Sequence, residues 1–180
     1  MLSTLSLTAL FFVISGIQYW ITNYFVQVLD VNERDTNIYF ALTCITSPIL
    51  GALASGKISH SFGGYESPKA IPTCIFYGLI AIAASLPFPF VNDYRICILL
   101  IWIVLFCGAL ILPILTGIML SSVEPELRPQ ANSLSNLSYN LLGYLPAPTI
   151  YGFAQNMTEG KKSRYGVAIL FYMTIFPVMF

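Results

Sequence analysis

Uncharged polar side chains interrupt the first long apolar stretch of the chain. The segment GIQYWITNYF (residues 16–25) carries Gln18, Tyr19, Thr22 and Asn23 among isoleucine and aromatic residues. Burying a polar group without a partner costs about 1–3 kcal/mol. These amides and hydroxyls therefore either bond to one another or face a polar space, and the chemistry that they offer is hydrogen-bond recognition.

A helical projection collects these side chains on one face. With an advance of about 100° per residue, Gln18, Tyr19, Thr22 and Asn23 share an arc with Ser15, and the opposite arc is apolar. Such a stripe either joins helices through hydrogen bonds of about 0.6 kcal/mol each or lines a polar cavity. We favour the cavity, because the stripe has more polar groups than helix packing requires.

The stretch of residues 130–155 repeats this pattern. Asn132, Asn136, Tyr139 and Asn140 again share one helical face, and neither stripe contains a charge. The two stripes predict a shared site for an uncharged or amphiphilic solute, with the second set of side chains opposite the first.

Residues suited to covalent or metal chemistry are few. His60 is the one histidine, and the four cysteines lie singly in apolar runs without a C-x-x-C pair. We therefore expect no catalytic residues, no metal and no cofactor. A membrane-embedded enzyme is the weaker alternative, because it would need paired acids or a serine–histidine pair within the apolar stretches.

The composition indicates an integral membrane protein. The chain is 57% hydrophobic and 9% charged, with a mean hydropathy of +0.77, whereas soluble domains carry about 25% charged residues. The formal net charge is zero, and no basic run indicates a nucleic-acid partner.

The elements that position the polar side chains are predicted to be membrane helices, each needing about 20 mostly apolar residues. The six expected spans are residues 5–29, 36–59, 69–91, 94–121, 130–155 and 165–180. All charged residues fall outside the middle of these spans. Gly143, Pro146 and Pro148 are expected to bend the fifth span. The sequence thus predicts an all-α, multi-pass protein formed by a single six-helix bundle with the lipid bilayer as partner.

One loop resembles a motif of the major facilitator superfamily. The stretch GKISHSFGGYESPKA (residues 56–70) places Gly56, His60 and Gly63 in the frame of the cytoplasmic G-x-x-x-D-x-x-G motif, whose glycines permit a tight turn. His60 stands where the family usually has aspartate.

A second loop resembles the start of the eleventh span in the same superfamily. The stretch EPELRPQANSL (residues 124–134) is similar to E-x-R-x-x-A-x-S/G, with Arg128 and Ala131 in matching positions. The continuation NLLGYLPAPTIYG (residues 140–152) resembles the eleventh span of Spinster-like lipid transporters and organic-anion transporting polypeptides. Tyr144 stands where Spinster-like members usually have an acidic residue.

The resemblance implies that this chain is the C-terminal half of a twelve-span secondary transporter. Its six spans would correspond to spans seven to twelve, and the polar stripes would line one wall of a central cavity for a small or lipid-like solute. The partner would be a six-span N-terminal half of the same chain or a second copy. The alternative is a self-sufficient six-span protein, such as a homodimeric half-transporter, a channel or a scaffold.

The resemblance also implies an orientation, with the loops of both motifs in the cytoplasm. These loops hold three basic residues, Lys57, Lys69 and Arg128, against five in the outer loops. The positive-inside rule favours the opposite orientation. We follow the resemblance, which places the glycosylation sequon at residues 156–158 outside.

Overall fold

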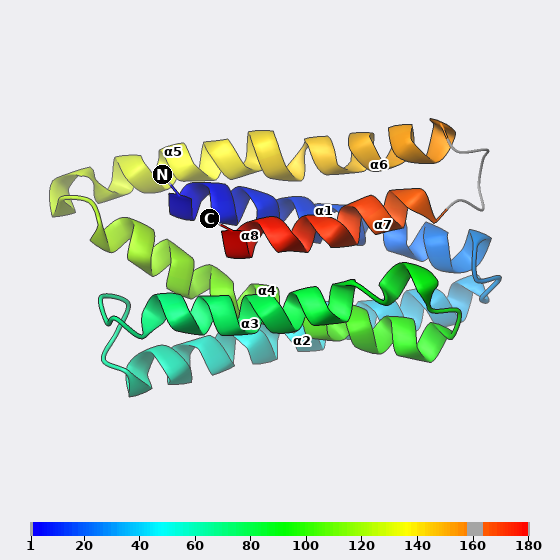
Figure 1. Cartoon of the computed structure of the whole chain (residues 1–180), viewed down its shortest axis with the longest axis horizontal. Helices are drawn as coiled ribbons and strands as arrows, with labels where there is room; N and C mark the ends of the chain where they lie inside the picture. Colours follow the sequence, from blue (N-terminus) through cyan, green and yellow to red (C-terminus); the bar gives the residue numbers. More distant parts are fainter. Residues whose placement is uncertain (1, 158–163, 180) are drawn as a thin grey trace.

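The chain folds entirely into helices. The computed structural model describes residues 2–157 and 164–179 (Figure 1). Every regular element within these residues is a helix, so the expectation of an all-α chain is confirmed. Part of the sequon, Thr158, and the loop lysines Lys161 and Lys162 lie outside this range.

Four helices are long and apolar enough to cross a membrane. They are α1 (Leu2–Gln27), α2 (Glu33–Ser61), α3 (Ala70–Ser85) with its 3₁₀ turn η1 (Phe88–Phe90), and α4 (Tyr94–Ser121). The bounds of α4 are those expected, and the others differ by a few residues. These lengths and compositions are compatible with a membrane protein.

The remaining helical pieces are shorter. In chain order they are the 3₁₀ turn η2 (Pro125–Leu127), α5 (Arg128–Tyr139), the π-helical turn η3 (Asn140–Tyr144), α6 (Pro146–Met157), α7 (Tyr165–Tyr172), the 3₁₀ turn η4 (Met173–Ile175) and α8 (Phe176–Met179). The expected fifth span is thus divided at η3 and the expected sixth at η4. Both remain predictions as membrane spans.

The helices lie lengthwise beside one another, and successive passes alternate in direction (Figure 1). The pieces α5, η3 and α6 follow one line, and α7 and α8 follow another. Helix α1 occupies the centre, because it packs against α4, the α5–η3–α6 line and the α7–α8 line. Helix α2 packs mainly against α4.

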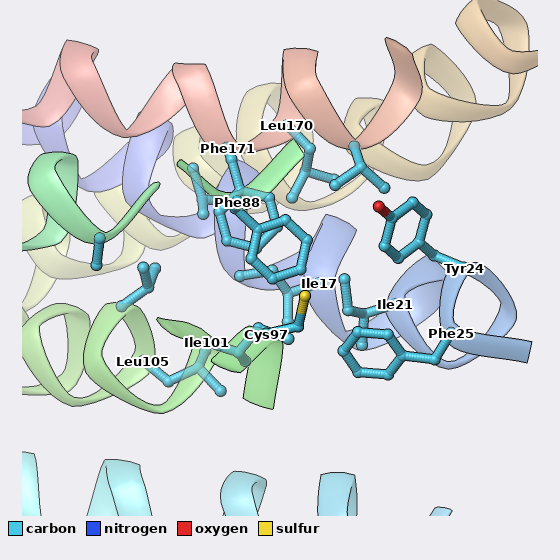
Figure 2. Close-up of a cluster of buried hydrophobic side chains, with 14 of the residues drawn as sticks. Ile17, Ile21, Tyr24, Phe25, Phe88, Cys97, Ile101, Leu105, Leu170 and Phe171 are labelled. Atoms are coloured by element: carbon cyan, nitrogen blue, oxygen red, sulfur yellow. The ribbon is translucent and has the colours of Figure 1, made fainter. Parts of the chain in front are cut away.

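A buried apolar cluster fixes α7 and η1 against α1 (Figure 2). Ile17 and Ile21 of α1 are almost fully buried there. The rings of Phe88 from η1 and Phe171 from α7 stack with their centroids 3.9 Å apart. Close packing of this kind maximises dispersion contacts, so segments distant in sequence are held as one bundle.

Helix α2 approaches α4 through a row of small side chains. The row consists of Thr43, Ser47, Gly51, Ser55 and Ser59, spaced four residues apart and all buried. Small residues let two helix backbones come close together. At Gly51 the approach is close, since a Cβ atom there would lie 2.5 Å from the carbonyl oxygen of Phe106.

We predict opposite effects for two alanine substitutions on α2. Gly51→Ala should lower the free energy of unfolding by about 1–3 kcal/mol, because the added methyl group overpacks the contact with α4. Gly56→Ala is the matched control, since no atom lies within 4 Å of a Cβ at Gly56, and it should raise the stability by about 0.5–1 kcal/mol. Denaturant unfolding of the protein in detergent, followed by circular dichroism, measures both. Equal effects would contradict the tight contact.

Candidate functional site

Two prolines break the helix that carries the second polar stripe. Pro146 and Pro148 have no N–H group, so the carbonyls of Leu142 and Tyr144 lose the donors that a regular α-helix would supply. Just before them the backbone widens into η3, where the N–H of Leu145 donates to the carbonyl of Asn140 at 3.0 Å. Single π-turns of this kind occur frequently at functional sites.

Side chains of α1 supply donors to the broken segment. The Ser15 hydroxyl donates to the carbonyl oxygen of Tyr144 at 2.7 Å. Pro148 cannot donate to this carbonyl, because it has no N–H group. The indole Nε1–H of Trp20 donates to the carbonyl of Pro148 at 3.0 Å. The polar groups of α1 thus stabilise irregular backbone, a condition for such backbone at membrane depth.

The same two segments pack closely through apolar contacts. The rings of Phe11 and Tyr139 stack with centroids 4.3 Å apart and planes 7° apart. Gly143 is buried, and a Cβ atom there would overlap the carbonyl oxygen of Thr8. The glycine expected to bend the helix therefore also allows η3 to touch α1.

Four of the eight predicted cavity residues fall, together with Tyr144, in one polar row, whose hydrogen bonds form two separate sets: one along α5 as far as Asn140, and one from Tyr144 to Gln18. The members of this row, which we call the amide row, are Asn132, Asn136, Asn140, Tyr144 and Gln18. The Asn136 amide donates to the carbonyl of Asn132 at 3.0 Å, and the Asn140 amide donates to that of Asn136 at 2.8 Å. The Tyr144 hydroxyl then donates to Oε1 of Gln18 at 3.4 Å and so links α5–η3 to α1.

The other predicted residues flank the amide row. The Tyr139 hydroxyl donates to Oδ1 of Asn136. Tyr19 is 67% exposed, and its ring meets Trp20 edge-on with centroids 5.5 Å apart. Thr22 and Asn23 are half-buried further along α1.

The two stripes adjoin on a single surface instead of facing each other. The α5–η3–α6 line runs in the same direction as α1 and packs along its side (Figure 1). The expectation that the second set lies opposite the first is therefore corrected. The exposed amides of Gln18 and Asn140 contribute to one wall, and a solute would meet that wall from one side.

Projection of each helix alone placed Ser15 on the polar arc of the first stripe but gave no role to Trp20 or Tyr144. Ser15 donates to the Tyr144 carbonyl, Trp20 donates to the Pro148 carbonyl, and the Tyr144 hydroxyl donates to Gln18 of α1. Pro148 carries the signal that could have found a partner for Ser15, since each proline implies an unpaired carbonyl four residues earlier. Trp20 donates to the carbonyl of Pro148 itself, and that signal does not point to it. Nothing in the sequence alone shows which helix supplies the donors.

The loop motif is divided between a helix and a turn. Gly56 lies within α2, as in the expected span of residues 36–59, and His60, which was expected in the loop, also lies within α2. Gly63 does lie in the turn, with a φ of 90° that favours glycine. Arg128 and Gly63 both line a pocket of about 380 Å³ between the two loops, where the Nε–H of Arg128 donates to the carbonyl of Val123 at 3.4 Å.

Neither the metal-ligating side chains nor comparison with known proteins assigns a function to this site. Across residues 2–157 and 164–179, no three histidine, cysteine, aspartate or glutamate side chains gather closely enough to hold a metal ion. Comparison of the sequence with protein-family models and with curated proteins finds no match in either set.

We predict that Ser15 and Pro148 are energetically coupled. Ser15→Ala should lower the free energy of unfolding by about 1–2 kcal/mol, because it leaves the Tyr144 carbonyl without that donor. In a Pro148→Ala background residue 148 regains an N–H group, so the same change should cost less. A double-mutant cycle measured by unfolding in detergent gives the coupling energy.

Ser133→Ala is the control for this cycle. Ser133 is exposed on α5, and its hydroxyl donates within its own helix to Pro129 at 3.0 Å. Its loss should change stability by no more than about 0.5 kcal/mol. An equal cost of Ser15→Ala in both backgrounds would contradict the role of Ser15.

Proposed function

We propose that this protein is a multi-pass membrane protein that forms the C-terminal half of a secondary transporter resembling the major facilitator superfamily. It moves an uncharged or amphiphilic solute by alternating access, and its partner is an N-terminal six-span half or a second copy. The observation that carries this proposal is the amide row beside a proline-broken helix. The four membrane-length helices are compatible with it.

The chemistry of the amide row suits solute recognition. Amide side chains offer both donors and acceptors, and those of Gln18 and Asn140 are exposed. Transporters commonly place their binding sites where membrane helices are discontinuous, and η3 interrupts the helix that carries Asn140 and Tyr144. The solute would exchange hydrogen bonds with water for hydrogen bonds with the row.

The distribution of charge supports an uncharged or amphiphilic solute. Helix α1 carries no acidic or basic residue between Leu2 and Gln27, and in α4 only Arg95 is charged, one residue after the helix begins. A charge at the centre of a membrane costs at least about 2.5–3.5 kcal/mol. Recognition in this half therefore relies on hydrogen bonds, and the half supplies no carboxylate for a proton relay within α1.

The irregular backbone offers a place for the helix to bend during transport. The π-turn η3 and the two prolines that follow have fewer internal hydrogen bonds than a regular helix. Ser15 and Trp20 bond to this segment from α1. Movement of the α5–η3–α6 line against α1 would thus alter the row itself.

We predict that leucine at Gln18 or Asn136 lowers transport without removing the protein from the membrane. Each change deletes a polar contact and should lower kcat/KM by about 5- to 30-fold. The measurement is uptake by vesicles reconstituted with the full-length protein, with a radiolabelled neutral sugar, a neutral amino acid and a lysophospholipid as test solutes. Asn37→Leu is the matched control, because Asn37 is exposed on α2 outside the row. Unchanged kinetics in both variants would refute the site.

We also predict that the row is reachable from water. In a variant whose four native cysteines are replaced, cysteine at Gln18 or Asn140 should react with a membrane-impermeant maleimide. Cysteine at Phe76 or Leu79 should not react, because these apolar side chains on α3 are exposed (59% and 53%) and would face lipid. Reaction at α3 but not at the row would contradict a polar cavity at this surface.

A further inference from the structure

A second pocket lies between the first turns of α2 and α4, away from the amide row. Its volume is about 430 Å³, within the range of about 300–1,000 Å³ that is typical of ligand pockets. The residues that line it are Val31, Asp35, Tyr39, Tyr94, Arg95 and Ile98. We call it the Tyr39–Tyr94 pocket. We propose that it binds the zwitterionic headgroup of a phospholipid, with its ammonium group at Asp35 and the tyrosine rings and its phosphate at Arg95.

Two helix caps bring the charged side chains to one level. The Asn32 side chain accepts from the backbone N–H of Arg34 at 2.9 Å, and the Asp93 side chain accepts from that of Arg95 at 2.8 Å. Such caps fix where a helix begins. Since α2 and α4 begin at the same end of the bundle (Figure 1), Asp35 lies in the first turn of one helix and Arg95 in the first turn of the other.

The tyrosine rings form an aromatic corner between these charges. The rings of Tyr39 and Tyr94 meet edge to face, with centroids 6.1 Å apart and planes 72° apart. The Tyr94 hydroxyl donates to the backbone carbonyl of Asp35 at 3.3 Å, which leaves the carboxylate for the pocket. Tyr39 is 52% exposed. A carboxylate beside aromatic faces suits an ammonium group, because the rings attract cations through their π-systems.

Arg95 provides the complementary site for an anion. Its guanidinium group is exposed at the pocket wall, and guanidinium groups bind phosphate oxygens in a bidentate manner. The positive ends of two helix dipoles also meet at this level. One pocket thus offers a negative and a positive group, which matches a headgroup that carries both charges.

The position of the pocket favours a lipid over a water-soluble zwitterion. Tyrosine is enriched where membrane helices meet the headgroup layer. Deeper along the same helices, exposed side chains are apolar, with Leu42 at 53% and Leu99 at 57% exposure. Further along, the two helices are joined by a hydrogen bond in which the Trp102 indole of α4 donates to the Thr46 hydroxyl of α2 at 3.1 Å. An acyl chain could lie along this surface below a headgroup held in the pocket.

Lipid binding to the purified full-length protein tests the proposal. The protein in detergent micelles is titrated with a phosphatidylcholine or a phosphatidylglycerol of matched acyl chains, and bound lipid is counted by native mass spectrometry. Phosphatidylcholine should bind more tightly. Asp35→Asn and Arg95→Gln should each weaken its binding by about 3- to 10-fold, and Tyr39→Leu by about 2- to 5-fold. Tyr39→Phe keeps the ring and should retain binding.

Neighbouring charges serve as matched controls. Glu33→Gln and Arg34→Gln alter the same turn of α2 at residues that do not line the pocket, and both should bind phosphatidylcholine like the unaltered protein. Equal losses in these controls would overturn the proposal, as would tighter binding of phosphatidylglycerol.

Soluble glycerophosphocholine should compete only weakly with phosphatidylcholine for the pocket. Competition at the affinity of the lipid would overturn the lipid assignment and indicate a site for a water-soluble zwitterion. Thermal unfolding of every variant checks that its fold is retained.

Discussion

The need to satisfy backbone carbonyls determines how the centre of this protein is built. Pro148 removes a donor from the helix that follows α5, and Ser15 of α1 replaces it. Trp20 makes a second bond to the same segment. Because an unpaired buried polar group costs about 1–3 kcal/mol, these bonds favour the arrangement in which α1 and the broken helix lie side by side. The central position of α1 follows from these bonds and from the aromatic stack of Phe11 on Tyr139.

The π-turn η3 also brings polar side chains next to a tightly packed contact between helices. Gly143 lets the widened turn touch α1, and Tyr144 then reaches Gln18 on the neighbouring helix. A regular α-helix of the same sequence would direct Tyr144 differently, since a π-turn changes the register of the side chains that follow it. The segment that weakens the helix is therefore the segment that connects the two sets of polar side chains.

The two sides of the bundle use different kinds of contact. On the side of α2, a row of small side chains centred on Gly51 brings α2 close to α4. On the side of α7, stacked rings of Phe88 and Phe171 fill the space between segments (Figure 2). The helix starts that carry Asp35 and Arg95 belong to this same pair of packed helices. The lipid pocket that we propose thus depends on backbone packing as well as on its charged side chains.

The sequence by itself determined that the chain is helical and where four membrane-length helices lie, because long, mostly apolar runs are a local property of the chain. It also marked the polar faces of α1 and α5, since helical periodicity is a local property. Periodicity could not show that the faces adjoin instead of opposing each other, nor that α2 extends through His60. Only the tertiary structure decided which helix donates to the carbonyl freed by Pro148, because that bond joins residues 129 positions apart.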